Sequence, residues 1–155
     1  MQLSARIVLD DVISAYDMLE TESDPQKFRI MWIAAISLCR SVGQVLNKID
    51  SKRSLDLSVK IEEQWREIKA NRQDNLIFHE FIEKERNLIL KEYEVGYISG
   101  SFGVVSGSTY LGQLDEGLYS PIASGEYEGE DCRDVLKQAI DWWIRKITKI
   151  EQYAH

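Results

Sequence analysis

The chain has 155 residues, 44% of them hydrophobic, with 19 basic and 26 acidic side chains that give a formal net charge of −7. This length suits one compact domain, and the hydrophobic fraction excludes wholesale disorder. The acidic balance excludes a surface that is basic throughout, the usual mark of nucleic-acid binders, and two cysteines cannot build a disulfide scaffold or a four-thiolate zinc site.

The apolar runs along the chain are short. The longest, from Ile30 to Cys39, covers about ten residues, roughly half of what a membrane span needs. The N-terminus, MQLSARIVLDD, has no apolar stretch that ends at a cleavage site. We therefore expect a cytoplasmic protein with neither a signal peptide nor a membrane contact.

Apolar residues spaced by three and four predict helices along most of the chain. Gly43 lies inside one of them, where glycine costs roughly 1 kcal/mol relative to alanine, so we expect another helix to approach closely there. Short connections between the first four helices favour antiparallel neighbours. The expected fold class is an all-α antiparallel bundle of four or five helices, in one domain over residues 1–155. The predicted helices run from about Leu3 to Leu19, from Pro25 (after the cap Ser23-Asp24) to Ile49, from after Ser54 through Ile68, from Asp74 to Tyr93, and from Asp131 to Tyr153.

Residues 94–131 form a predicted insertion before the last helix. They hold seven acidic side chains, no Lys or Arg, eight of the nine glycines and four of the seven tyrosines. The insertion thus carries −7, and the rest of the chain balances 19 acidic residues (26 − 7) against 19 basic ones. Residues 97–105 and 108–111 mix β-forming with turn residues and predict a small hairpin or an ordered loop. Its acidic surface would suit a protein partner.

The fourth predicted helix carries the one motif with chemical content. Arg86 falls on its apolar stripe, four residues after Ile82 and three before Ile89. A guanidinium on a buried face must find partners, because desolvating an unpaired charge is costly. Asn87 supplies an amide beside it. The alternative is an Arg at the edge of the stripe that extends its head to water.

The segment 78–93 resembles the signature helix of HEPN domains, helical bundles found among prokaryotic toxins, defence proteins and RNA-cleaving enzymes. The family pattern is an Arg, often followed by Asn, then four to six residues, then a His, commonly with a Tyr close behind. Arg86 and Asn87 match the first half of this pattern, and Tyr93 resembles the trailing aromatic residue. Lys91, which follows Arg86 after four intervening residues, occupies the position where the pattern at its shortest spacing has the His. The positions at the two longer spacings do not hold a His either.

The resemblance implies a homodimer in which Arg and His of both protomers line a metal-free RNA-cleaving cleft, in a prokaryotic stress, defence or toxin–antitoxin setting. The Arg would stabilise charge on the phosphate and the His would move a proton. Lys91 suits a phosphate-binding charge better than a base, because its pKa starts near 10.4 and Glu92 and Glu94 hold the ammonium charged. His79 precedes Arg86 by two helical turns, about 10.5 Å, which is too far to address the same phosphate within one protomer.

Other constellations of polar residues indicate no further chemistry. A di-iron bundle needs Glu-x-x-His pairs on two helices, and no Glu precedes His79 at that spacing. Glu62, Glu63, Glu83 and Glu85 are therefore predicted to lie on solvated helix faces. The glycines of the insertion lack the lysine and the following helix of a phosphate loop. We expect no metal and no cofactor.

The sequence leaves three hypotheses of function. We favour a non-catalytic, dimeric HEPN-like module that binds a partner, with Arg86, Asn87, Tyr93 and Tyr97 as candidate binding residues. The alternative is a metal-independent endoribonuclease that uses Arg86, Asn87 and Lys91, with RNA as its partner. In the third hypothesis the acidic insertion covers a basic cleft as a mimic of nucleic acid.

Overall fold

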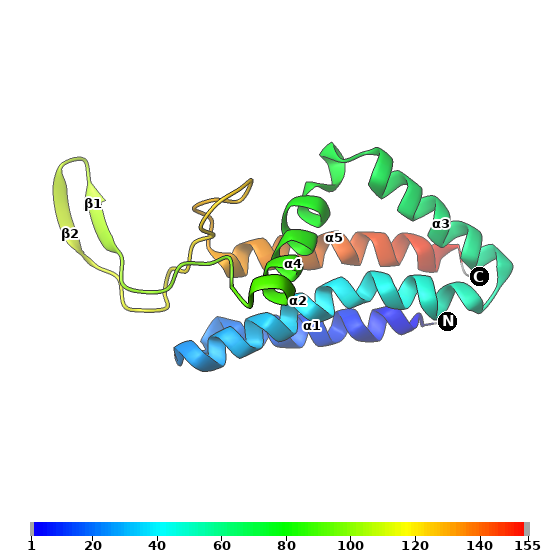
Figure 1. The fold of residues 1–155 in the computed structure, drawn as a ribbon, viewed down its shortest axis with the longest axis horizontal. Coiled ribbons are helices and arrows are strands. Elements are labelled where there is room, and N and C mark those ends of the chain that lie inside the picture. The colour runs from blue at the N-terminus through cyan, green and yellow to red at the C-terminus, as the bar shows by residue number, and fades with distance from the viewer. Residues whose placement is uncertain (1, 154–155) are drawn as a thin grey trace.

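The computed structural model describes residues 2–153 as a helical bundle with a small two-stranded sheet (Figure 1). The predicted helical class and the order of the elements are confirmed. The helices are α1 (Ser4–Thr21), α2 (Pro25–Lys48), α3 (Leu55–Ala70), α4 (Glu83–Glu92) and α5 (Cys132–Gln152), and the strands β1 (Gly103–Ser106) and β2 (Thr109–Gln113) lie between the last two helices.

Side-chain caps set the starts of α2 and α3, as the sequence indicates. Asp24 accepts a hydrogen bond of 2.9 Å from the backbone amide of Lys27 at the start of α2. Ser54 accepts one of 3.2 Å from the amide of Leu57 at the start of α3. These side chains satisfy amides that the first turn of an α-helix leaves without partners.

The core lies between α1, α2 and α5, which run side by side, and α3 and α4 pack across them (Figure 1). Trp32 of α2 and Trp143 of α5 are the largest fully buried side chains. The expected close approach at Gly43 is confirmed, since a Cβ there would lie 2.8 Å from the Trp65 ring of α3 and 3.1 Å from the Trp143 ring. Gly43 thus lets rings of two other helices reach the backbone of α2.

The fourth predicted helix is not a single α-helix. A short 3₁₀ turn, Gln73–Asn75, is followed by a π-helical segment, η3 (Ile77–Ile82), and then by α4. The side chain of Asn75 is buried, accepts a hydrogen bond of 3.0 Å from the indole nitrogen of Trp142 and donates one of 2.7 Å to the carbonyl of Asn71. The two hydrogen bonds of Asn75 hold the chain in place just before η3. Within η3 itself, whose π turn is wider than an α-helical turn, four side chains are buried. They are Ile77, Phe78, Phe81 and Ile82.

Residues 94–131 connect α4 to α5, and the predicted hairpin is confirmed there. Strands β1 and β2 pair antiparallel around a turn in which Gly107 has a φ of 60°, a conformation that favours glycine. The hairpin projects away from the helices (Figure 1). At the base of the segment, Tyr97 and Ile122 form an isolated β-bridge, and the ring of Tyr97 packs against Phe28 and Trp32 of α2.

One segment, Pro25–Lys52, contains an 18-residue window whose length and mean hydropathy of 1.3 would suit a membrane span. Most of it is α2, which packs against α1, α4 and α5. Its apolar stripe belongs to the core of the bundle, so a core helix accounts for the same composition.

Candidate functional site

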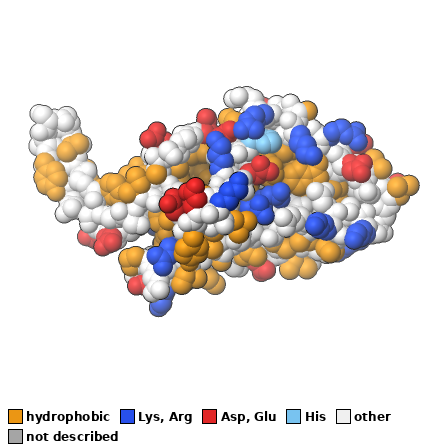
Figure 2. All heavy atoms as spheres, viewed as in Figure 1, with side chains coloured by type: hydrophobic (Ala, Val, Ile, Leu, Met, Phe, Trp, Pro, Cys, Tyr) orange, Lys and Arg blue, Asp and Glu red, His pale blue; other side chains and the backbone are white. Residues whose placement is uncertain are grey.

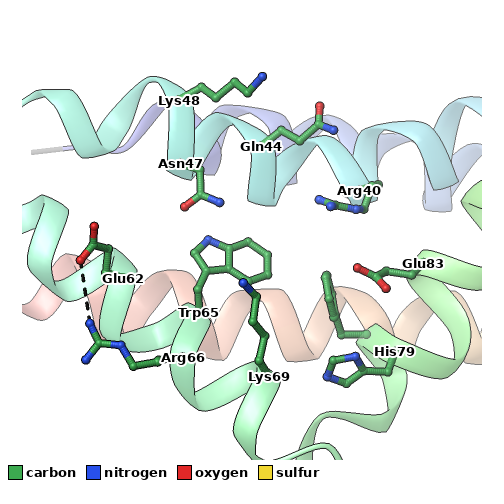
Figure 3. A pocket seen from close by; sticks show the side chains of 11 residues that line it. Arg40, Gln44, Asn47, Lys48, Glu62, Trp65, Arg66, Lys69, His79 and Glu83 are labelled. Carbon is green, nitrogen blue, oxygen red and sulfur yellow. Dashed lines mark ion pairs between the residues drawn. The ribbon is translucent and has the colours of Figure 1, made fainter.

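A cleft of about 800 Å³ lies between α2 and α3 and is closed at one end by η3 and the start of α4 (Figure 3). This volume is within the range of pockets that hold small ligands. The cleft is lined by Arg40, Gln44, Asn47 and Lys48 from α2, by Glu62, Trp65, Arg66 and Lys69 from α3, and by Phe78, His79 and Glu83 from η3 and α4.

Helical spacing gathers these polar side chains on two facing stripes. Side chains three and four residues apart lie on the same face of an α-helix. On α2 the stripe runs from Arg40 to Lys48, on the side away from the core, and on α3 it runs from Glu62 to Lys69. In Figure 3, Asn47 and Arg40 lie on the side of α2 that faces α3, and Lys48 and Gln44 lie at the outer edge of the cleft.

The cleft carries more positive than negative charge. Its only ion pair within residues 2–153 joins Arg66 to Glu62 at 3.9 Å. Because both side chains are exposed, this pair contributes little to the stability of the fold. Arg40, Lys48 and Lys69 take part in none of the ion pairs of the described chain. In Figure 2, Lys and Arg side chains gather on this face around the His. The cleft therefore favours an anionic ligand.

Arg40 lies at the junction of two cavities. Its guanidinium carbon is 5.7 Å from the centroid of the Phe78 ring. Burial lowers the pKa of Arg40, the nearby charge of Glu83 raises it, and that of Arg86 lowers it further. A guanidinium remains charged at neutral pH, so this half-buried cation gains from an anion placed beside it. Arg40 also lines a separate, smaller cavity of about 190 Å³ together with Arg86.

An aromatic wall flanks the cations. The ring of Trp65 lies between α2 and α3 (Figure 3). It packs edge-on against Phe78, with the centroids 5.5 Å apart, and against Trp143 at 6.4 Å. These contacts hold the half-buried Trp65 ring in one place. It offers a fixed apolar surface on which a planar ligand can stack.

His79 lines the same cleft from the π-helical segment. Its Nε2 lies 2.9 Å from the carbonyl oxygen of Ile68. A carbonyl only accepts, so Nε2 is the donor of this hydrogen bond. The imidazole is thus held in one orientation at the edge of the cleft, a role that helical periodicity did not reveal.

The motif residues of the fourth helix are only partly brought together. The Arg86 guanidinium donates to the Asn87 side-chain oxygen at 3.4 Å, and Arg86 borders the smaller cavity. Lys91 is exposed and lines neither this cavity nor the cleft. The structure therefore joins Arg86 to Arg40 rather than to Lys91.

The two candidate tyrosines lie apart from this group. Tyr93 follows α4 in the left-handed conformation, with a φ of 51°, and is 69% exposed. Tyr97 is buried, and its ring packs edge-on against Phe28 and Trp32, with the centroids 5.2 and 5.5 Å away. Tyr97 anchors the start of the insertion in the core, and neither tyrosine lines the cleft.

The prediction of a solvated helix face is wrong for Glu85, which is 6% exposed. Its Oε1 accepts hydrogen bonds from the indole nitrogen of Trp32 at 3.0 Å and from the backbone amide of Gly96 at 2.6 Å. Burial raises the pKa of Glu85, and these two hydrogen bonds oppose the shift. The carboxylate is covered because the insertion returns over α4, a contact that helical periodicity cannot show.

Both cysteines are buried. Burial raises the pKa of Cys39 to about 12 and that of Cys132 well above its ordinary value. Because the thiolate is the nucleophile, neither side chain is reactive at neutral pH.

The acidic insertion contributes no side chain to the cleft. Its hairpin projects from the far end of the molecule (Figure 1). Within residues 2–153, the insertion therefore does not cover the basic cleft between α2 and α3.

Sequence reasoning also missed the cations of the cleft, Arg40, Lys48, Arg66 and Lys69. Their signal is present as polar residues at helical spacing on two neighbouring helices.

Comparisons of the chain with models of protein families, with curated proteins and with solved structures find no match.

Proposed function

We propose that this chain is a HEPN-like helical bundle that binds single-stranded RNA in the cleft between α2 and α3, without cleaving it. The observation that carries the proposal is one open cleft that combines unpaired cations with the fixed ring of Trp65. Single-stranded nucleic acid is bound by this combination, because cations follow the phosphates while bases stack on aromatic rings. Arg40 and Lys69, on opposite sides of the cleft, would contact successive phosphates.

The net charge of −7 does not oppose this ligand. The acidic surplus belongs to residues 94–131, while the rest of the chain balances 19 acidic residues (26 − 7) against 19 basic ones. Charges more than about 10 Å apart are largely screened at ordinary ionic strength. The local field in the cleft is therefore set by its own cations.

The HEPN-like part of the proposal is supported by the resemblance of segment 78–93 and by the order of the helices. The homodimer is carried over from the same resemblance. Binding without cleavage is proposed because the family's pair of Arg and His is not assembled. Arg86 and His79 line different cavities, and Lys91 lines neither.

Fluorescence anisotropy with a labelled oligouridine of about twelve nucleotides tests the proposal. We expect saturable binding. The logarithm of the association constant should fall against the logarithm of the salt concentration with a slope of about −3, because each of the four cations of the cleft releases counterions from the single strand and contributes about −0.7. Lys69→Gln and Arg40→Gln should each weaken binding and reduce the slope by about 0.7.

The matched control is Lys137→Gln, which removes the same charge from an exposed ion pair with Asp141 on α5. It should bind as the wild type does. No saturable binding at low salt, or an equal loss in the control, would overturn the proposal. Light scattering on the same samples tests the dimer separately.

A second candidate function is the metal-independent endoribonuclease, and one observation favours it. The imidazole of His79 lines the cleft together with Lys69 and Arg40. A positioned imidazole can move a proton near neutral pH. Cleavage of the same RNA in chelator-treated buffer that is lost in His79→Gln would replace the binding proposal with this one.

A further inference from the structure

A separate cavity of about 390 Å³ lies between the fourth helix and the insertion. It shares no lining residue with the cleft between α2 and α3. Its floor includes the buried Glu85, and Glu94 lies among its lining residues. Its apolar walls are Phe81, Leu88, Val95, Ile122 and Tyr127.

The carboxylate of Glu85 has no cationic partner in this cavity. Within residues 2–153, both of its hydrogen bonds go to Oε1, from the neutral donors of Trp32 and Gly96, and Oε2 receives none. None of the ion pairs of the described chain includes Glu85. Gly96 passes so close that a Cβ there would overlap Oε2. The backbone at Gly96 is thus fitted closely around the carboxylate, whose Oε2 accepts no hydrogen bond within residues 2–153.

Burying a carboxylate without a counter-charge is costly, and a ligand that brings a cation removes part of that cost. The nearest lysine that lines the cavity, Lys84, already pairs with Glu80. Phe81 and Tyr127 meet edge-on, with their centroids 6.2 Å apart, and such rings also favour a cation near their faces. The cavity therefore combines an anionic floor with apolar and aromatic walls.

We propose that this cavity binds a small primary alkylamine in its ammonium form, with the ammonium on Oε2 of Glu85 and the alkyl chain against Phe81 and Tyr127. A metal ion fits less well, because residues 2–153 contain no group of three or more His, Cys, Asp or Glu side chains that could hold one. This site is independent of RNA binding in the other cleft.

The test uses n-butylammonium and its uncharged analogue 1-butanol as matched probes. The indole N–H signal of Trp32 reports on Glu85 directly, because it donates to that carboxylate. Titration followed by two-dimensional NMR should give a saturable shift of this signal with n-butylammonium, at dissociation constants of about 1 mM or below, and none with 1-butanol.

Glu85→Gln keeps an acceptor oxygen for Trp32 and Gly96 but removes the charge, so binding should weaken about tenfold or more. Glu92→Gln removes the same charge from an exposed position outside the cavity and should bind as the wild type does. Equal binding of both probes, or equal affinity in Glu85→Gln, would overturn the proposal. If Glu85→Gln fails to fold, the comparison of the two probes on the wild type still decides. Arg40→Gln should bind n-butylammonium normally, which separates this result from the outcome for RNA.

Discussion

The ring of Trp65 on α3 lies against Gly43 of α2, so closely that a Cβ at Gly43 would lie 2.8 Å from the nearest ring carbon. The ring of Trp143 approaches the same glycine from α5. This contact sets the separation of α2 and α3 and places Trp65 at the wall of the cleft. The packing of the core and the shape of the cleft thus both depend on the absence of a side chain at Gly43.

Gly43→Ala should destabilise the protein although alanine is the better helix former. The gain in helix propensity is about 1 kcal/mol, whereas forcing a ring out of a packed core costs about 1–3 kcal/mol. We expect a net loss of about 1 kcal/mol in the free energy of unfolding by urea, together with weaker RNA binding as Trp65 moves. Gln26→Ala, at an exposed position of the same helix, is the control. A more stable Gly43→Ala protein would contradict this reading of the contact.

The sequence predicts the helices well because their causes are local. Caps at Asp24 and Ser54 and the apolar stripes lie within each helix. Asn75, just before the π-helical segment, accepts a hydrogen bond from Trp142, 67 residues away, and no local pattern encodes this contact. For the same reason the cleft escapes sequence analysis, since Arg40 and Lys69 become neighbours only when α3 packs across α2.

Asp50 links the start of α1 to the end of α2, and its removal should be costly. Its buried carboxylate accepts hydrogen bonds from the amides of Ser4 at 2.8 Å and Ala5 at 2.9 Å and pairs with Arg53 at 3.2 Å. Asp50→Ala leaves these donors unpaired and should lower the free energy of unfolding by about 2 kcal/mol. Thermal or urea unfolding measures this. Asp56→Ala, at an exposed position, should change it by less than about 0.5 kcal/mol. Equal effects of the two variants would refute the capping role.

Glu85 should make stability fall as the pH rises from mildly acidic to neutral. Burial raises its pKa in the folded state, so the folded protein holds this proton more tightly than the unfolded chain, whose pKa is about 4.3. The contribution of Glu85 to the free energy of unfolding is fully present below that unfolded-state pKa and is lost as the pH rises through the folded-state pKa. Glu85→Gln should therefore gain stability relative to the wild type as the pH rises above the unfolded-state pKa of about 4.3.

Glu80→Gln is the control of opposite sign. Hydrogen bonds from Lys84 and Arg72 lower the pKa of Glu80, so its contribution appears above the unfolded pKa and is lost on acidification. Its substitution should become more damaging as the pH rises. Urea unfolding at several pH values measures both variants, and parallel trends would show that the two carboxylates are not distinguished by their surroundings.

The hairpin should be dispensable for folding. Its strands carry exposed side chains such as Val105, Tyr110 and Leu111, and it projects away from the helices (Figure 1). Replacing residues 103–113 by two glycines retains Phe102 and Leu114, whose backbones are already joined by a hydrogen bond of 2.8 Å. We expect the free energy of unfolding to change by less than about 0.5 kcal/mol and RNA affinity to be retained. Loss of the folded state would show that the hairpin supports the bundle.

Photo-crosslinking tests the central claim most directly, because it locates the RNA on the protein. An oligonucleotide that contains 4-thiouridine is irradiated with the wild-type chain, and the adducts are assigned by mass spectrometry. The account predicts adducts at Trp65, Lys69 and His79, around the cleft between α2 and α3. Adducts confined to Tyr93 or to the hairpin residue Tyr110, or no adduct at saturating RNA, would contradict it.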